Sequence, residues 1–238
     1  MDLTDKEATI QREALEFAKK NKKTIAKQFT DPKKFPSEEN PVSVFMAGSP
    51  GAGKTESSIE LLKKFSSTPI IRIDPDELRS QFKEYTGQNA WLFQAAVSVL
   101  VDRIHDLVLG QKQSFLLDGT LSRYEVAKRN IKRSLEKKRT VQILYVYQEP
   151  QLAWDFVQAR EAAEGRRIRV QDFIDQYFGA REVVNRLKKE YGNNIKVDLL
   201  LKNNDNSQRT YRAGVDQIDN HIHEKYTRAD LERMFRTS

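Results

Sequence analysis

The sequence predicts an α/β fold with a mostly parallel central sheet, because short apolar strand patterns alternate with amphipathic helix patterns along most of its 238 residues. The strand patterns are rich in β-branched and aromatic side chains. One glycine-rich stretch joins the first strand pattern to the helix pattern after it. A chain of this length is expected to form one such domain, with amphipathic helices added at its N-terminal side.

The N-terminal segment, Thr4 to about Phe29, places apolar residues at helical spacing among charged ones and predicts one or two amphipathic helices. A polar stretch with three prolines, Asp31 to Pro41, predicts an extended connection. We therefore expect a helical segment and linker over residues 1–40 and the α/β domain over residues 41–238. Packing over the sheet edge is the simpler role for these helices, and docking of an inhibitor is the alternative.

The glycine-rich stretch matches a phosphate-binding pattern at every required position, and its residues are Gly48-Ser49-Pro50-Gly51-Ala52-Gly53-Lys54-Thr55. A buried strand pattern over Val42 to Ala47 precedes it and a helix pattern over Glu56 to Phe65 follows it, which is the context that a P-loop requires. Its glycines let backbone N–H groups turn toward phosphate oxygens. Lys54 is then expected between the β- and γ-phosphates, and the Thr55 hydroxyl is expected to bind Mg²⁺. The predicted fold is therefore a three-layer P-loop nucleotide-binding fold.

A second strand pattern, Pro69 to Asp74, is followed directly by a helix start at Asp74-Pro75-Asp76-Glu77. Carboxylates at the carboxyl end of a strand can reach an acceptor hydroxyl placed against the γ-phosphate. Asp74 and Glu77 also match a capping box, with Pro75 at the first helical position. That interpretation leaves Asp76 without a structural role.

The βα alternation continues beyond this point, and the last strand pattern is expected to end the sheet. The loop after it, Lys202 to Asp205, is expected to flank the adenine, and Asp118, at the end of one strand, is expected to hold Mg²⁺ through water. The expected helices are Trp91–Leu109, Arg123–Lys138, Pro150–Ala163, Asp172–Tyr191 and much of Ala213–Phe235, and the expected strands are Ser114–Leu117, Val141–Tyr147 and Ile195–Leu201.

Four arginines surround Gly165 at the end of one helix pattern: Arg160, Arg166, Arg167 and Arg169. A mobile arginine-bearing segment can neutralise the charge of a transferring phosphoryl group and exclude water when it closes. The alternative is a helix end that complements the helix dipole. Because four guanidinium groups exceed what a helix end needs, we favour a lid near residues 160–170.

Composition narrows the function further. The formal net charge of +7 and the isoelectric point near 9.4 indicate an anionic partner, but most basic runs match solvated helix faces, so nucleic acid is not the favoured one. The absence of cysteine excludes disulfides, thiolate catalysis and Cys-ligated zinc. No stretch is apolar enough to span a bilayer, and the charged start lacks the apolar core of a signal peptide, so we expect a cytoplasmic protein.

The ordered set of motifs resembles the zeta-toxin family, bacterial P-loop kinases that phosphorylate UDP-N-acetylglucosamine and related UDP-amino sugars. The resemblance covers about Val42 to Asn204. It rests on the P-loop, on the strand ends Ile73–Asp76 and Asp118–Thr120, and on Arg160 with the arginines beyond it.

The resemblance implies a role for each matching residue. Lys54 and Thr55 would bind phosphate and Mg²⁺, and Asp76 would be the base that receives the proton of the sugar hydroxyl. Arg160 and Arg167 would stabilise the transferring phosphoryl group, although Arg166 or Arg169 could take the place of Arg167.

Two further residues would lie in the substrate site. Thr120 would contact the UDP-sugar, and Asp102 stands where the family has a glutamate. The resemblance also implies an inhibitory partner, a small helical antitoxin. The expected activity is transfer of the γ-phosphate of ATP or GTP, and the alternatives are a polynucleotide kinase and a nucleotide-dependent switch protein.

Overall fold

The computed structural model describes residues 3–64, 69–165, 167–202, 209–223 and 225–236. Its sheet has six strands in the order β2-β3-β1-β4-β5-β6. β1 to β5 pair in parallel and β6 pairs antiparallel to β5, so the predicted mostly parallel sheet is confirmed. The strands are β1 Val42–Ala47, β2 Ile71–Ile73, β3 Phe115–Leu117, β4 Thr140–Tyr147, β5 Lys196–Lys202 and β6 Arg209–Arg212.

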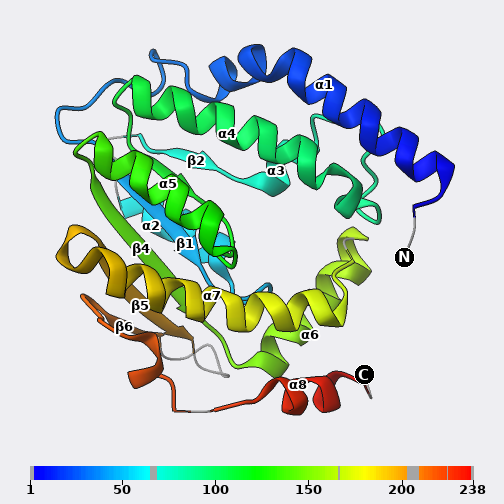
Figure 1. Cartoon of the computed structure of the whole chain (residues 1–238), viewed down its shortest axis with the longest axis vertical. Coiled ribbons are helices and arrows are strands. Elements are labelled where there is room, and N and C mark those ends of the chain that lie inside the picture. The colour runs from blue at the N-terminus through cyan, green and yellow to red at the C-terminus, as the bar shows by residue number, and fades with distance from the viewer. Residues whose placement is uncertain (1–2, 65–68, 166, 203–208, 224, 237–238) are drawn as a thin grey trace.

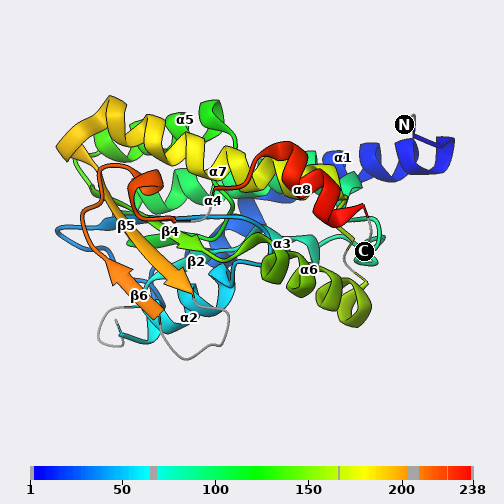
Figure 2. The same cartoon turned by 90° about the horizontal axis from the view of Figure 1, so that it is seen from below.

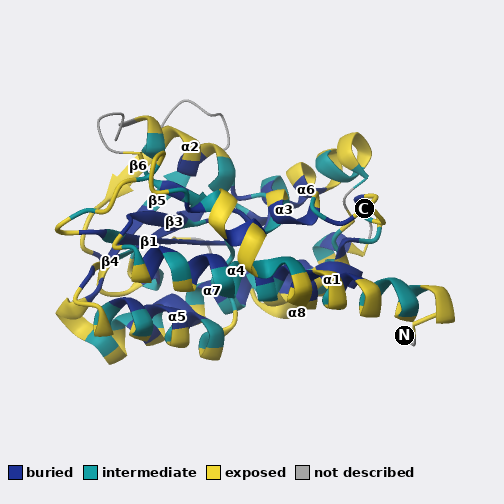
Figure 3. Cartoon of the chain, turned by 90° about the horizontal axis from the view of Figure 1, so that it is seen from above, coloured by how far each residue is buried: buried dark blue, intermediate teal, exposed yellow. Residues whose placement is uncertain are grey.

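Helices cover both faces of this sheet and complete the predicted three layers. α2 lies on one face, while α4, α5 and α7 lie on the other (Figure 2 and Figure 3). Three short 3₁₀ helices, η1 to η3, interrupt the connections. The helices are α1 Asp5–Phe29, α2 Lys54–Lys64, α3 Pro75–Arg79, η1 Ala90–Phe93, α4 Gln94–Gly110, α5 Tyr124–Glu136, α6 Pro150–Glu164, α7 Val170–Tyr191, η2 Gly192–Asn194, η3 Ile218–Asn220 and α8 Arg228–Phe235.

The central strand β1 is buried on both faces, as its mostly apolar sequence predicts. Successive side chains of a strand point to opposite faces. Phe45 and Ala47 accordingly join the large core under α4, α5 and α7, whereas Val44 and Met46 join the smaller core under α2. The two cores fix β1, and with it the start of the P-loop, from both sides.

α1 is a single helix that packs along α4 (Figure 1). It begins at a capping box, in which Thr4 and Glu7 exchange hydrogen bonds with each other's backbone N–H groups. Its buried side chains, among them Ala14 and Ala18, belong to the large core that the sheet shares. The proposed division of the chain near residue 40 remains a prediction.

The C-terminal region differs from the prediction. β5 is not the last strand, because Arg209–Arg212 adds an antiparallel edge strand whose polar sequence resembles a loop. The expected helix over Ala213–Phe235 is wrong except for α8. Before α8 the chain is irregular, because Gly214 turns with a φ of +65° and Val215 and Ile218 point into the core. Of the loop expected to flank adenine, residues 203–205 lie outside the described residues.

Within the described ranges, no helix combines the length and the apolarity that crossing a bilayer requires.

The packing of α1 predicts a strong effect of charge at its buried face. Ala18 is fully buried, so Ala18→Asp places a carboxylate without a partner in the core and should lower the free energy of unfolding by about 3 kcal/mol. The same substitution at Ala8, which is exposed on the same helix, should change it by less than about 1 kcal/mol. Urea unfolding of both variants measures the difference, and equal stabilities would mean that α1 is not part of the core.

Candidate active site

The carboxyl ends of β1, β2, β3 and β4 border one cavity of about 680 Å³. Ligands of open α/β sheets bind at this edge, where connections from neighbouring strands leave in opposite directions. β1 continues toward β2, whereas its neighbour β4 continues toward β5. Predicted site residues from four separate segments line the cavity together: Pro50, Gly51, Gly53, Lys54, Thr55, Asp76, Asp118, Thr120 and Arg160.

The P-loop glycines are required by the protein's own packing as well as by a phosphate. Gly48 and Gly51 have φ angles of +131° and +71°, which side chains disfavour. A Cβ atom on Gly48 would lie 2.2 Å from the carbonyl oxygen of Val146, and one on Gly51 would lie 2.0 Å from that of Ala153. The backbone of the loop therefore packs closely against the end of β4 and the first turns of α6.

The basic groups of the P-loop lie at the start of α2, where free backbone N–H groups and the helix dipole favour an anion. The Lys54 ammonium donates a hydrogen bond to the carbonyl oxygen of Ser49 at 2.6 Å. A second lysine, Lys202 at the end of β5, donates to the carbonyl oxygen of Gly53 at 3.1 Å. Lys202 lines the cavity and begins the loop that was expected to flank the adenine, but no role was predicted for its side chain, because a lysine at a strand end carries no motif.

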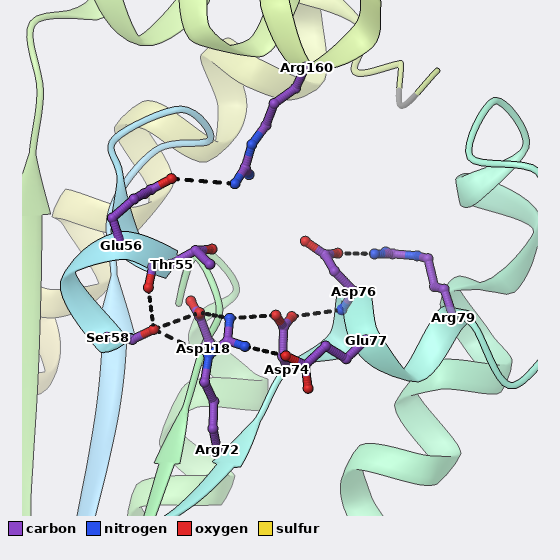
Figure 4. A network of polar contacts seen from close by, with 10 residues as sticks. All are labelled: Thr55, Glu56, Ser58, Arg72, Asp74, Asp76, Glu77, Arg79, Asp118 and Arg160. Carbon is purple, nitrogen blue, oxygen red and sulfur yellow. Dashed lines mark hydrogen bonds and ion pairs between the residues drawn. The ribbon is translucent and has the colours of Figure 1, made fainter. Parts of the chain in front are cut away.

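Arg72 of β2 joins the acids of two neighbouring strand ends (Figure 4). Its Nη2 atom donates to Asp74 Oδ2 at 2.6 Å and to Asp118 Oδ2 at 2.7 Å. Its Nε atom donates to the Ser58 hydroxyl at 3.2 Å, and its Nη1 atom pairs with Glu77. Arg72 was not predicted as a site residue, although a lone arginine inside an apolar strand is a usable signal of a buried charge partner.

The predicted capping box at the start of α3 is only half correct. Asp74 accepts a hydrogen bond from the Asp76 N–H at 2.8 Å, and Pro75 occupies the first turn as expected. Glu77 pairs with Arg72 instead of returning a bond to Asp74, because a guanidinium is a stronger partner for a carboxylate than a backbone N–H. Burial, reinforced by the charge of Asp76, raises the pKa of Asp74 to about 6.

Asp76 lies on the first turn of α3, and its carboxylate forms an ion pair with Arg79 one turn later. Arg79 is buried, and its Nη2 atom donates to the side-chain oxygen of Gln94 at 3.3 Å. Both Arg79 and Gln94 line the cavity. Neither residue was predicted as part of the site, because no local pattern in the sequence pairs the acids of this helix start with their partners.

The arginine-rich segment reaches the cavity through Arg160. Its guanidinium lies 3.7 Å from Glu56 at the start of α2, above the acids in Figure 4. Arg167 is largely exposed beside Glu161 and is not among the described residues that line the cavity. Arg169 pairs with Asp172 at the start of α7. Arg166 lies outside the described residues, so the assignment of a second arginine remains a prediction.

The end of α6 packs against the loop that follows α3. Gly165 ends the helix with a φ of +70°. A Cβ atom on Gly87 would lie 2.7 Å from the carbonyl oxygen of Glu164, so the two backbones touch at this point. α6 thus begins beside the P-loop and ends beside the loop after α3, and its residues form one wall of the cavity. The proposed lid function of this segment remains a prediction.

The two predicted substrate contacts lie in different places. Thr120 lines the cavity, and its hydroxyl is 3.0 Å from that of Ser122. Asp102 lies on the part of α4 that faces α5, pairs with Arg129 at 3.2 Å and does not line the cavity. Its carboxylate is half exposed. A contact between Asp102 and a substrate remains a prediction that this structure does not favour.

Asp118 and Thr55 fit a magnesium ion that arrives with a nucleotide. Asp118 Oδ2 accepts hydrogen bonds from Arg72 and Ser58, whereas its Oδ1 atom makes none within the described chain. No group of three or more His, Asp and Glu side chains in the described ranges could hold a metal by itself. Mg²⁺ is commonly held by one or two protein oxygens together with phosphates and water, so this sparse set is appropriate.

The fold and the cavity define a P-loop protein of the kinase type. The family model described as zeta toxin matches residues 26–216, which is most of the chain. This chain therefore belongs to the zeta-toxin family, and its membership together with the P-loop supports a toxin phosphotransferase that binds ATP. Comparison with curated proteins gives no significant match.

Several solved structures resemble this fold, and one of them comes from a toxin–antitoxin system. A structure from the PezAT chromosomal toxin–antitoxin system of Streptococcus pneumoniae is 19% identical, covers 98% of this chain and 93% of its own, and has a TM-score of 0.60. The AvrRxo1-ORF1:AvrRxo1-ORF2 structure with sulphate ions is 16% identical, with coverages of 90% and 70% and a TM-score of 0.58. The related structure with ATP is 18% identical, with coverages of 85% and 65% and a TM-score of 0.56. At these identities the likeness concerns the fold.

The packing of the P-loop predicts that Gly51→Ala weakens nucleotide binding. The added methyl group clashes with the Ala153 carbonyl, so the loop must move, and affinity for an ATP analogue should fall at least about tenfold. Gly110→Ala is the control, because a Cβ atom at Gly110 meets no atom within 4 Å. Calorimetric titration measures both affinities, with urea unfolding as a check of the fold. Unchanged affinity in Gly51→Ala would contradict the described role of the loop.

Proposed function

We propose that this chain is a kinase that transfers the γ-phosphate of ATP, or of GTP, to a sugar hydroxyl of UDP-N-acetylglucosamine or a related UDP-amino sugar. By this reaction it would act in the cytoplasm as a bacterial toxin on the supply of cell-wall precursors. The observation that carries the proposal is that the P-loop and Asp76 line one cavity, on neighbouring sides of the same sheet edge. A donor phosphate and an acceptor hydroxyl bound there would lie next to each other.

The proposed chemistry is a direct displacement at phosphorus. The acceptor hydroxyl oxygen forms a bond to the γ-phosphorus, while the bond from that phosphorus to the β,γ-bridging oxygen breaks. The nucleoside diphosphate leaves with the bridging oxygen, and the hydroxyl proton passes to the carboxylate of Asp76. Most of the rate enhancement in such a reaction comes from positioning and charge neutralisation.

Asp76 is better suited than Asp74 to receive the proton. Asp74 Oδ2 is bound to Arg72 and its Oδ1 atom accepts the Asp76 N–H, so both oxygens serve the structure. The side chain of Asp76 is about one-third exposed and lines the cavity, and its ion pair with Arg79 orients the carboxylate. Arg79 is a positioning residue in this scheme, since Gln94 and burial hold it in place.

The charge that develops on the phosphoryl oxygens would be neutralised from the donor side. Lys54 and the N-terminus of α2 approach the phosphates from the P-loop, and Arg160 approaches from α6. Arg160 reaches Glu56 across the cavity, so the same reach could bring it to a phosphate. Thr55 and Asp118 would hold a magnesium ion at this place, and the ion would supply positive charge to the phosphates and the leaving group.

We also propose that a separate small helical antitoxin inhibits the protein. The solved structures with this fold include a chromosomal toxin–antitoxin system. Among the described residues, α1 contributes none to the cavity lining, so this helix does not itself fill the proposed nucleotide site. Its place against α4 supports a structural role over the alternative role in docking an inhibitor.

The direct test is mass spectrometry of UDP-sugars incubated with the protein, ATP and Mg²⁺. UDP-N-acetylglucosamine should gain one phosphoryl group, and Asp76→Asn should slow this reaction about 10²–10⁴-fold with little change in ATP affinity. Asp74→Asn is the matched control. Asn also caps helices well, so this variant should lose far less activity. Lys54→Ala should nearly abolish turnover.

Other outcomes would point elsewhere. Loss of activity in Asp74→Asn with full activity in Asp76→Asn would reverse the roles of the two acids. Phosphorylation of an oligonucleotide end but of no UDP-sugar would support the polynucleotide kinase alternative. Absence of any acceptor phosphorylation, with partner binding that depends on the nucleotide, would support a switch protein.

A further inference from the structure

Arg72 is the cation shared by three carboxylates in the candidate active site. It contacts Asp74, Glu77 and Asp118, and the side chains of Asp74 and Asp118 are only 9% and 5% exposed. The arginine side chain is itself 13% exposed. Two buried carboxylates that bind the same nitrogen atom repel each other strongly, and a buried charge is stable only when it is paired. The pairing depends on the fork of a guanidinium, because one ammonium group could not span all these partners.

The same contacts fix Asp118 relative to the P-loop helix. Arg72 Nη2 and the Ser58 hydroxyl both donate to Asp118 Oδ2, at 2.7 Å and 3.2 Å. Ser58 lies on α2 and its hydroxyl is also 2.8 Å from the carbonyl oxygen of Thr55, the residue that is expected to bind Mg²⁺. Asp118 is therefore held by one oxygen, and Ser58 connects that oxygen to the backbone of Thr55. Its other oxygen makes no hydrogen bond within the described ranges.

We propose that Arg72 is a positioning residue for the magnesium–nucleotide complex: it holds Asp118 by one oxygen and keeps the other directed to the metal that arrives with the phosphates. The inference rests on the nucleotide and metal site of the proposed function, and it is independent of the acceptor. Because Arg72 already supplies one positive charge to this acidic cluster, the protein without nucleotide has little need of a metal ion. Magnesium binding is thereby coupled to the arrival of the nucleotide.

The test is a double-mutant cycle on the binding of a nonhydrolysable ATP analogue, measured by calorimetry with Mg²⁺ and again with EDTA. Arg72→Lys keeps the charge and loses the fork. It should lower, by at least about fivefold, the gain in affinity that Mg²⁺ provides. The affinity measured in EDTA should stay within about twofold of that of the unchanged protein. Asp118→Asn should show a similar loss. The double variant should bind no worse than Asp118→Asn, because Arg72 acts through Asp118.

Two further variants distinguish a specific loss of Mg²⁺-dependent affinity from a loss caused by unfolding. Arg129→Lys is the matched control, since Arg129 pairs with Asp102 in an exposed ion pair away from the cavity and should leave all affinities unchanged. The second variant, Arg72→Gln combined with Asp74→Asn, is used if Arg72→Lys does not fold. It removes one cation and one carboxylate together, so the net charge of the cluster is unchanged. In this double substitution, Mg²⁺ should raise the affinity for the ATP analogue as little as it does in Arg72→Lys. Thermal unfolding in EDTA reports whether each variant is folded.

An unchanged Mg²⁺ gain in folded Arg72→Lys, or in the charge-balanced pair, would overturn the proposal. Losses that simply add in the double variant would also overturn it, because they would place Arg72 in a structural role unrelated to Asp118. The measurement needs no acceptor. If no UDP-sugar is phosphorylated but the cycle gives the expected result, the proposed acceptor is wrong and the inference about Arg72 stands.

Discussion

The candidate site depends on the parallel pairing of β1 with β3 on one side and β4 on the other. In this register Phe45 of β1 lies beside Leu117 of β3, and Ala47 lies beside Tyr145 of β4. The P-loop, Asp118 and the start of α6 therefore emerge at one edge of the sheet. β2, paired with β3, brings Asp74 and α3 to the same edge. Backbone hydrogen bonds between strands thus assemble a cavity from segments that are far apart in the sequence.

Two kinds of contact make this edge rigid enough for chemistry. Close backbone packing holds the P-loop against β4 and α6, and only glycine fits at Gly48 and Gly51. Charge pairing holds the acids, since Arg72 links β2, β3 and α2, while Arg79 holds Asp76 from the side of α4. Backbone geometry thereby organises the P-loop side of the cavity, and buried guanidinium groups organise the acids that line it.

The sequence predicted what local patterns encode. The bounds of β1 and the presence of the P-loop followed from a motif with its strand and helix context, and the parallel sheet followed from the alternation of patterns. Partner residues were not predictable in this way. Arg72 and Arg79 are single arginines whose roles depend on which strands are neighbours, and β6 is a polar edge strand without an apolar signal. Asp102 keeps an acid where the family has a glutamate, yet the packing of α4 turns it toward Arg129.

In the proposed reaction, donor and acceptor meet in one cavity and the phosphoryl group passes directly between them. The most direct measurement is the stereochemical course of the reaction with ATP that is chiral at its γ-phosphorus. A single in-line displacement inverts the configuration at phosphorus, so we expect inversion in the phosphorylated sugar. Retention would require two displacements through a phosphorylated side chain, and it would contradict the assignment of Asp76 as a base.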